Sequence, residues 1–251
     1  MLAIIGGTGL TEMDSFELEA QEKLLTPYAD EPVEVEIFSL DGKSLAFLSR
    51  HGKAHAVPPH KVNYRANIAA LKELGVDGIV AINAVGGIHE QLAPGSFIVP
   101  DQLIDYTHSR AVSFFEDKLE EVVHIDFSQP FDSHLRQRLL DSARRIEDAA
   151  GGSQRLQMSS GVYGCTQGPR LETAAEIRRL KQDGCDMVGM TAMPEAALAR
   201  EKSLAYAMLA QSVNWAAGLT AEQISMDEIR TIVGEGREFI IGLIRELLRS
   251  D

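Results

Sequence analysis

Two short segments of the sequence carry groups that could hold an anion. The segment Ile4–Gly9 runs from apolar residues into glycines. Glycines let successive backbone N–H groups face outward, and Thr8 adds a hydroxyl donor. Arg50 and His51 end another apolar run, and there Arg50 offers a planar fork to a phosphate and His51 a further donor. A plainer interpretation of the glycine segment is a tight turn, and a plainer interpretation of Arg50 and His51 is a surface pair. The glycines lack the spacing of a dinucleotide-binding loop.

Three further apolar runs end on small, amide, hydroxyl or sulfur-bearing residues, namely Asn83-Ala84, Met190-Thr191 and Asn214. In addition, Glu172 stands at the expected start of a helix, where it could simply complement the helix macrodipole. Asn214 could likewise only cap a turn, and Met190 could be core. No Ser-His-Asp spacing and no Cys-His metal set competes in the sequence. Together these strand ends indicate a site for an anion and a polar ligand.

The elements that must position these residues alternate along the chain. Apolar runs of strand length and segments of helical period predict an α/β fold, a mixed central β-sheet flanked by helices in one domain, 1–251. Strands are expected at 2–5, 33–39, 45–50, 78–84, 96–103, 161–166, 186–190 and 204–213. Helices are expected at 60–74, 131–149, 172–181, from Pro194 onward, and at 227–248. In such folds ligand residues stand at strand ends.

Composition narrows the class of partner. The chain has 251 residues, 24 Lys and Arg against 37 Asp and Glu, and a net charge of −13. An acidic surface repels phosphate backbones, so nucleic acid is not an expected partner. No apolar run reaches the roughly 20 residues that span a bilayer, and the first residues lack the basic and apolar regions of a signal peptide. Cys165 and Cys185 form no disulfide framework, and we expect a cytoplasmic protein.

Several motifs together resemble the trimeric purine nucleoside phosphorylases, in the branch that acts on methylthioadenosine or methylthioinosine. The similarity runs from Ala3 to about Leu247. The motifs are Ile5-Gly6-Gly7-Thr8-Gly9, Arg50-His51-Gly52, Val62-Asn63-Tyr64-Arg65-Ala66-Asn67, Gly168-Pro169-Arg170, and Gly189-Met190-Thr191 with Met193-Pro194-Glu195. The resemblance implies a homotrimer that cleaves purine nucleosides with inorganic phosphate as co-substrate, without metal or organic cofactor.

The resemblance also implies roles for individual residues. Phosphate is expected to bind to Thr8, Arg50, His51, Asn83, Ala84 and Thr191. The nucleoside is expected to contact Leu171, Glu172, Val188, Met190, Asn214, Ala216, Met226 and Ile229, with His124 entering from a neighbouring subunit. Of these residues, Asn214, Glu172 and His51 are the expected catalytic groups.

The expected base is a 6-oxopurine. Enzymes of this family that act on 6-aminopurines have Asp where Asn214 and Ala216 stand here, and they lack the acid found at Glu172. A 6-oxopurine presents a donor at N1, which the Glu172 carboxylate can accept, and acceptors at N7 and O6, to which the Asn214 amide can donate. Adenine presents an acceptor at N1, a mismatch that costs on the order of 1–3 kcal/mol per group.

The expected sugar carries a 5′-methylthio group. By resemblance, the start of the last helix forms the 5′ wall, and Met226 and Ile229 make it apolar. Together the two arguments predict S-methyl-5′-thioinosine as the substrate. The alternatives are S-methyl-5′-thioadenosine, a general inosine or guanosine substrate range, and a binding module without turnover. The role of Trp215 stays open between packing beside the base and filling the core, and core is favoured.

Overall fold

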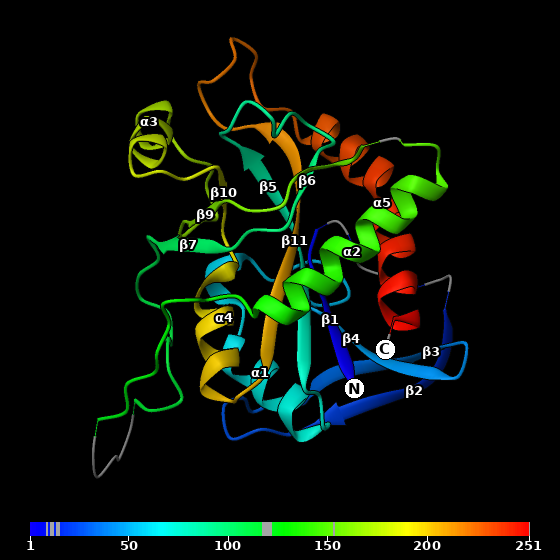
Figure 1. Ribbon diagram of the computed structural model, residues 1–251. Helices are drawn as coiled ribbons and strands as arrows, with labels where there is room; N and C mark the ends of the chain where they lie inside the picture. Colours follow the sequence, from blue (N-terminus) through cyan, green and yellow to red (C-terminus); the bar gives the residue numbers. More distant parts are fainter. Residues whose placement is uncertain (9, 11–12, 14–15, 117–121, 153, 251) are drawn as a thin grey trace.

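The structure is a computed structural model that describes residues 1–8, 10, 13, 16–116, 122–152 and 154–250 (Figure 1). Gly9 of the first motif lies outside the described residues. The strands are β1 (Leu2–Gly6), β2 (Glu17–Leu24), β3 (Val33–Leu40), β4 (Lys43–Ser49), β5 (Gly78–Gly87), β6 (Phe97–Ile98), β7 (Gln102–Asp105), β8 (Leu156–Met158), β9 (Val162–Cys165), β10 (Met187–Gly189) and β11 (Ala205–Trp215). The helices are the short 3₁₀ turn η1 (Pro59–Lys61), α1 (Tyr64–Glu73), α2 (Ser133–Ala149), α3 (Ala174–Gln182), α4 (Ala192–Glu201) and α5 (Met226–Arg249).

The strands form one mixed sheet with β5 at its centre. The main path runs β2-β3-β4-β1-β5-β10-β9-β7, and β11 pairs with β5 and β6. The pairs β1–β4, β1–β5 and β5–β11 are parallel, whereas β2–β3, β3–β4 and β5–β10 are antiparallel. The predicted α/β class with a mixed sheet is confirmed, and the predicted strands 33–39 and 45–50 appear as the antiparallel pair β3 and β4.

One edge of β5 changes partner along its length. β11 pairs with residues 78–87 on one edge, so β1 and β10 share the other edge. There β1 pairs with residues 78–81 and β10 only with Gly86 and Gly87. Residues 82–85 therefore lie between two strands that diverge. This divergence leaves backbone and side-chain groups of Ile82 and Asn83 available to other parts of the chain.

Helices cover both faces of the sheet (Figure 1). Along β1, Leu2 and Ile4 pack into a core shared with α2 and α5, whereas Ala3 and Ile5 pack into a core shared with α1 and α4. This alternation follows from the two-residue period of a strand. Side chains cap the helix starts: Asn63, Asp132, Thr173 and Ser225 accept from backbone N–H groups of α1, α2, α3 and α5.

The sheet differs from the prediction in the split of strand 96–103 and in the strands β2 and β8, which were not predicted. The expected strand 96–103 is two strands, because β6 ends before Pro100, which has no N–H for a ladder, and β7 pairs with β9 instead. The polar strand β2 was not expected, since most of its residues are exposed and show no apolar alternation. It is an edge strand that pairs with β3, and charged side chains are typical of such edges.

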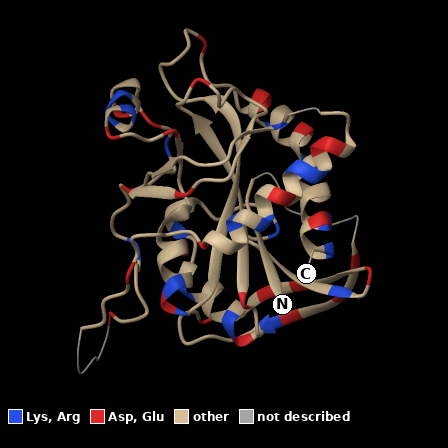
Figure 2. Cartoon of the chain, in the orientation of Figure 1, with Lys and Arg blue, Asp and Glu red and all other residues tan. Residues whose placement is uncertain are grey.

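Charged side chains lie mainly on the outer helices and on the β2–β3 edge, and the central strands carry few of them (Figure 2). Among the described residues, no helix is long and apolar enough to cross a membrane.

Candidate active site

A cavity of about 420 Å³ lies where β5 parts from β1. Its walls come from the ends of β1 and β4, from β5, from the segments around β10 and α3, and from β11 and the start of α5. The cavity wall includes every expected site residue except His124: Thr8, Arg50, His51, Asn83, Ala84, Leu171, Glu172, Val188, Met190, Thr191, Asn214, Ala216, Met226 and Ile229. Strand ends that are distant in sequence thus meet at one place.

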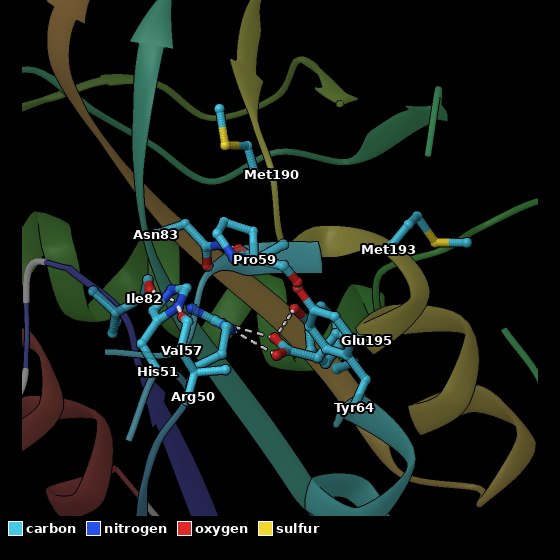
Figure 3. A network of polar contacts seen from close by, with 12 residues as sticks. Arg50, His51, Val57, Pro59, Tyr64, Ile82, Asn83, Met190, Met193 and Glu195 are labelled. Carbon is cyan, nitrogen blue, oxygen red and sulfur yellow. Dashed lines mark hydrogen bonds and ion pairs between the residues drawn. The ribbon is translucent and has the colours of Figure 1, made fainter. Parts of the chain in front are cut away.

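A buried ion pair fixes Arg50 at the floor of this cavity (Figure 3). Arg50 donates from Nε and Nη2 to the two carboxylate oxygens of Glu195 on α4, each at 2.7 Å. Both side chains are 1% exposed, and Tyr206 donates a third hydrogen bond to Glu195 at 2.7 Å. Burial opposes the charge of Arg50, but Glu195 more than offsets this and raises the pKa of the guanidinium further.

The orientation of Arg50 corrects one detail of the expectation from sequence. The Nε–Nη2 edge of the guanidinium donates to Glu195, so this edge is not available to a ligand. Nη1 donates to the carbonyl of Ile82 at 3.3 Å. A Cβ added at Gly7 would lie 2.7 Å from Nη1 and 2.8 Å from the Ile82 oxygen. Gly7 is therefore required for close approach of β1 to Arg50, and a phosphate could reach only the remaining Nη1 and Nη2 hydrogens.

Asn83 and Thr191 form a second polar contact in the cavity wall. Asn83 Nδ2 donates to Thr191 Oγ1 at 2.5 Å, and both residues are buried. Because the Thr191 oxygen accepts this bond, its own hydroxyl hydrogen is free to point at a ligand. Asn83 Oδ1 is buried and has no hydrogen-bond partner among the described residues. Buried polar atoms normally have partners, so this pair is arranged for a polar group inside the cavity.

His51 is held as a neutral imidazole. Its Nδ1 lies 2.8 Å from the carbonyl oxygen of Val57, and a carbonyl only accepts, so Nδ1 carries the proton. Burial and the nearby charge of Arg50 lower the pKa of His51 to about 4. In the neutral form Nε2 is then an acceptor. The structure thus corrects the expectation that the unliganded His51 offers a second donor at neutral pH.

This environment predicts a pH-dependent stability. The pKa of His51 is about 4 in the folded chain and about 6.5 in an unfolded one. Between these values the unfolded state binds the extra proton, so the free energy of unfolding falls as the pH falls from 6.5 to 4. Melting temperatures of the protein and of His51→Gln across this range, without phosphate, test it. The variant should lose less stability on acidification, and equal slopes would contradict the assignment.

Glu172 is oriented by a neighbour and is not needed as a helix cap. Thr166 donates from its hydroxyl to Glu172 Oε1 at 2.6 Å. The start of α3 is instead satisfied by a capping box, in which Thr173 accepts from the N–H of Glu176 and Glu176 accepts from the N–H of Thr173. Glu172 is therefore not the cap of α3, and it is one of the residues that line the cavity.

Asn214 reaches the cavity from the end of β11. One hydrogen of its Nδ2 group is donated to the carbonyl of Trp215 at 2.7 Å, which fixes the amide plane and leaves the second hydrogen for a ligand. Trp215 itself is half-buried and is absent from the cavity wall. The expectation that Trp215 fills the core is not met either, because it is outside the buried clusters.

The rim of the cavity is apolar. Leu171 is 43% exposed and Met226 is 55% exposed, whereas Ile229 and Val188 beneath them are buried. Met226 and Ile229 share the start of α5, as the sequence predicted. Together with Met190 and Ala216 these residues give one part of the cavity an apolar wall.

Sequence reasoning missed several residues of the site. Glu195 was named only as the last residue of a motif, and nothing in the sequence pairs it with Arg50, which lies 145 residues away. Arg110 donates from Nη1 to the carbonyl of Met190 at 2.9 Å and from Nη2 to that of Gln167 at 2.8 Å, so it ties two cavity walls together. His55 also lines the cavity, with its Nε2 3.5 Å from Thr8 Oγ1.

His124 is the one expected site residue that lies elsewhere. It is exposed, in the segment before α2, and it is not part of the cavity wall of its own chain.

The chain belongs to the phosphorylase superfamily, whose sequence model matches residues 1–249. It is 52% identical over 234 residues to a probable S-methyl-5′-thioinosine phosphorylase of Pseudomonas syringae pv. tomato, covering 93% of this chain and 92% of the relative. It is 41% identical over 248 residues to a 6-oxopurine nucleoside phosphorylase of Pyrococcus furiosus, covering 97% and 90% of the two chains.

A solved structure has the same fold. Methylthioadenosine phosphorylase from Schistosoma mansoni in complex with adenine superposes with a TM-score of 0.92 at 31% identity, and the match covers 99% of this chain and 91% of the other. The predicted membership of the nucleoside phosphorylases is confirmed by these comparisons.

Proposed function

We propose that this protein cleaves S-methyl-5′-thioinosine with inorganic phosphate, giving hypoxanthine and 5-methylthioribose 1-phosphate. The observation that carries the proposal is that one cavity unites an anion site with a base site. Asn83 and Thr191 stand in its wall with Arg50, and Glu172 and Asn214 stand in the same wall. Relatives named for S-methyl-5′-thioinosine support the same substrate.

At the phosphate end, Thr8, Arg50, Asn83, the backbone of Ala84 and Thr191 hold the anion, and neutral His51 accepts through Nε2 from the protonated oxygen of the phosphate. The guanidinium supplies charge, and the Thr191 hydroxyl supplies a donor because its oxygen already accepts from Asn83. Phosphate bound here stabilises the electron-poor sugar as the bond from C1′ to N9 of the base breaks. A phosphate oxygen then bonds to C1′. This chemistry requires neither a metal ion nor an organic cofactor.

At the base end, Glu172 and Asn214 distinguish a 6-oxopurine from adenine. Glu172 accepts from N1–H through the carboxylate oxygen that Thr166 does not use, and Asn214 donates to N7 or O6. As the base departs it gains negative charge, and the Asn214 donor stabilises that charge. The leaving base then takes a proton at N7, and the phosphate loses one as its oxygen bonds to C1′, so the protons balance. Leu171, Val188, Met190 and Ala216 complete the nucleoside site.

At the sugar's 5′ end, Met226 and Ile229 form an apolar wall. A methylthio group gains roughly 0.8 kcal/mol per buried methylene-sized unit there. A free 5′-hydroxyl loses water at the same wall and needs a polar partner in return. This contrast favours the methylthio nucleoside over inosine.

The assembly and setting are part of the same proposal. We propose a homotrimer in the cytoplasm, in which residues 1–251 act as one domain and His124 enters the site of a neighbouring subunit. Exposed apolar side chains on the His124 segment, Val122 at 77% and Val123 at 41%, and at the cavity rim support burial against another copy. The family match over 1–249 supports one domain, and free buried cysteines fit a reducing compartment.

The test of the substrate is base release from matched concentrations of methylthioinosine, methylthioadenosine and inosine, each with and without phosphate. We expect kcat/KM for methylthioinosine to exceed that for methylthioadenosine by about 10- to 100-fold, because of the mismatch at N1. Preference for methylthioadenosine would overturn the base assignment. Inosine as the best substrate would overturn the apolar 5′ wall.

A further inference from the structure

Thr166 follows β9 and has a rigid backbone. Its N–H donates to the carbonyl of Gly189 at 2.8 Å, and its own carbonyl accepts from Arg110 Nη2 at 3.3 Å. The Thr166 side chain therefore starts from a fixed backbone position. Its hydroxyl oxygen lies 2.6 Å from Glu172 Oε1 and 3.4 Å from the carbonyl oxygen of Gly189. A hydroxyl has one hydrogen to donate, and the shorter contact shows that Glu172 receives it.

We propose that Thr166 is a positioning residue that sets the base preference of this site by holding the Glu172 carboxylate in place as a hydrogen-bond acceptor. The inference builds on the proposed function, since it assigns Glu172 to N1 of the base. No motif of the sequence marked Thr166, and it acts through Glu172.

The orientation of the Glu172 carboxylate is fixed from outside α3. Glu172 comes just before α3, outside the capping box of Thr173 and Glu176. Helix capping therefore does not fix its carboxylate, and the 2.6 Å bond from Thr166 does. With Oε1 bonded to Thr166, Oε2 is the oxygen left to accept from a ligand. A carboxylate held in place loses less freedom on binding the nucleoside than one that must first be ordered.

A carboxylate that accepts a hydrogen bond at this position suits one base and not the other. Adenine has an acceptor at N1, so Glu172 can satisfy it only as a protonated carboxyl that donates. The alternative acceptor for Thr166, the Gly189 carbonyl, is a poor one at 3.4 Å. The hydroxyl therefore holds the carboxylate in place as an acceptor, which suits N1–H of a 6-oxopurine and opposes the N1 acceptor of adenine.

The experiment compares Thr166→Val, which keeps the shape and removes the hydroxyl, with Thr166→Ser, which keeps the hydroxyl. For each, kcat/KM is measured with methylthioinosine and with methylthioadenosine, and the KM for phosphate serves as the control for the anion end. In Thr166→Val we expect the ratio of the two kcat/KM values to fall about tenfold. In Thr166→Ser we expect the ratio of the original protein.

A structural role alone would lower both activities together and leave their ratio unchanged, so an unchanged ratio in Thr166→Val overturns the inference. A fall in the ratio of the two kcat/KM values in Thr166→Ser also overturns the inference, because the hydroxyl is still present. If Thr166→Val does not fold, Thr166→Ala removes the same hydroxyl with less bulk and is scored in the same way. Failure of the proposed function is separate: it shows as a lack of preference for methylthioinosine in the unmodified protein.

Discussion

Replacing Asn214 by Ala should lower kcat for methylthioinosine by about 100- to 1,000-fold, the loss seen when one preorganised donor to a developing negative charge is removed. Asn214 is held by its bond to the Trp215 carbonyl, so its free N–H is directed before the substrate arrives. The donor acts mainly as the base departs, and the KM for phosphate should stay unchanged. Steady-state kinetics with both substrates varied measures this.

Asn214→Asp is the matched variant, because it keeps the shape of the side chain and replaces the amide donor by an acceptor. We expect it to lose activity toward methylthioinosine at least as severely as Asn214→Ala. Melting curves of both variants establish that the fold is intact. A loss below about threefold in both variants would remove Asn214 from the chemistry and leave it as a turn residue.

Replacing Glu195 by Ala should destabilise the protein by about 3–5 kcal/mol, because it leaves the buried charge of Arg50 without its partner. Arg50 and Glu195 are each 1% exposed, and removal of the carboxylate also leaves the Tyr206 hydroxyl without its partner. For a chain of this size the loss corresponds to a melting temperature lower by roughly 10 °C. Thermal and denaturant unfolding measure it, and phosphate binding should weaken in parallel because Arg50 loses its fixed orientation.

The control for this prediction is Arg144→Ala, which breaks an exposed pair between Arg144 and Asp141, with side chains 60% and 43% exposed. Exposed pairs contribute about 0–1 kcal/mol, so this variant should melt close to the unmodified protein. Equal decreases in melting temperature for the two variants would show that the buried pair stabilises the fold no more than the exposed pair does.

The sequence allowed most elements to be predicted because their periodicity is strong. The apolar run of β5 and the amphipathic stripe of α5 both appear at their expected places. Prediction failed where local pattern carries little information. β2 is exposed and charged, and only its pairing with β3 makes it a strand. The split of 96–103 is decided by which neighbour each half pairs with, which is a property of the whole sheet.

The candidate site shows the same division. Strand ends with donors, small residues and a carboxylate could be found by inspection, and all but His124 line one cavity. The partners of those residues could not be found in this way. Glu195 meets Arg50, and Thr166 meets Glu172, through packing that the sequence does not encode locally. The tautomer of His51 depends likewise on one carbonyl, that of Val57.

The most direct test of the central claim follows the products of methylthioinosine by phosphorus NMR and by chromatography of the base. The account predicts that hypoxanthine and a sugar phosphate ester appear in equal amounts, and that neither forms without phosphate. Hypoxanthine released without phosphate and with free methylthioribose would identify a hydrolase and contradict the account.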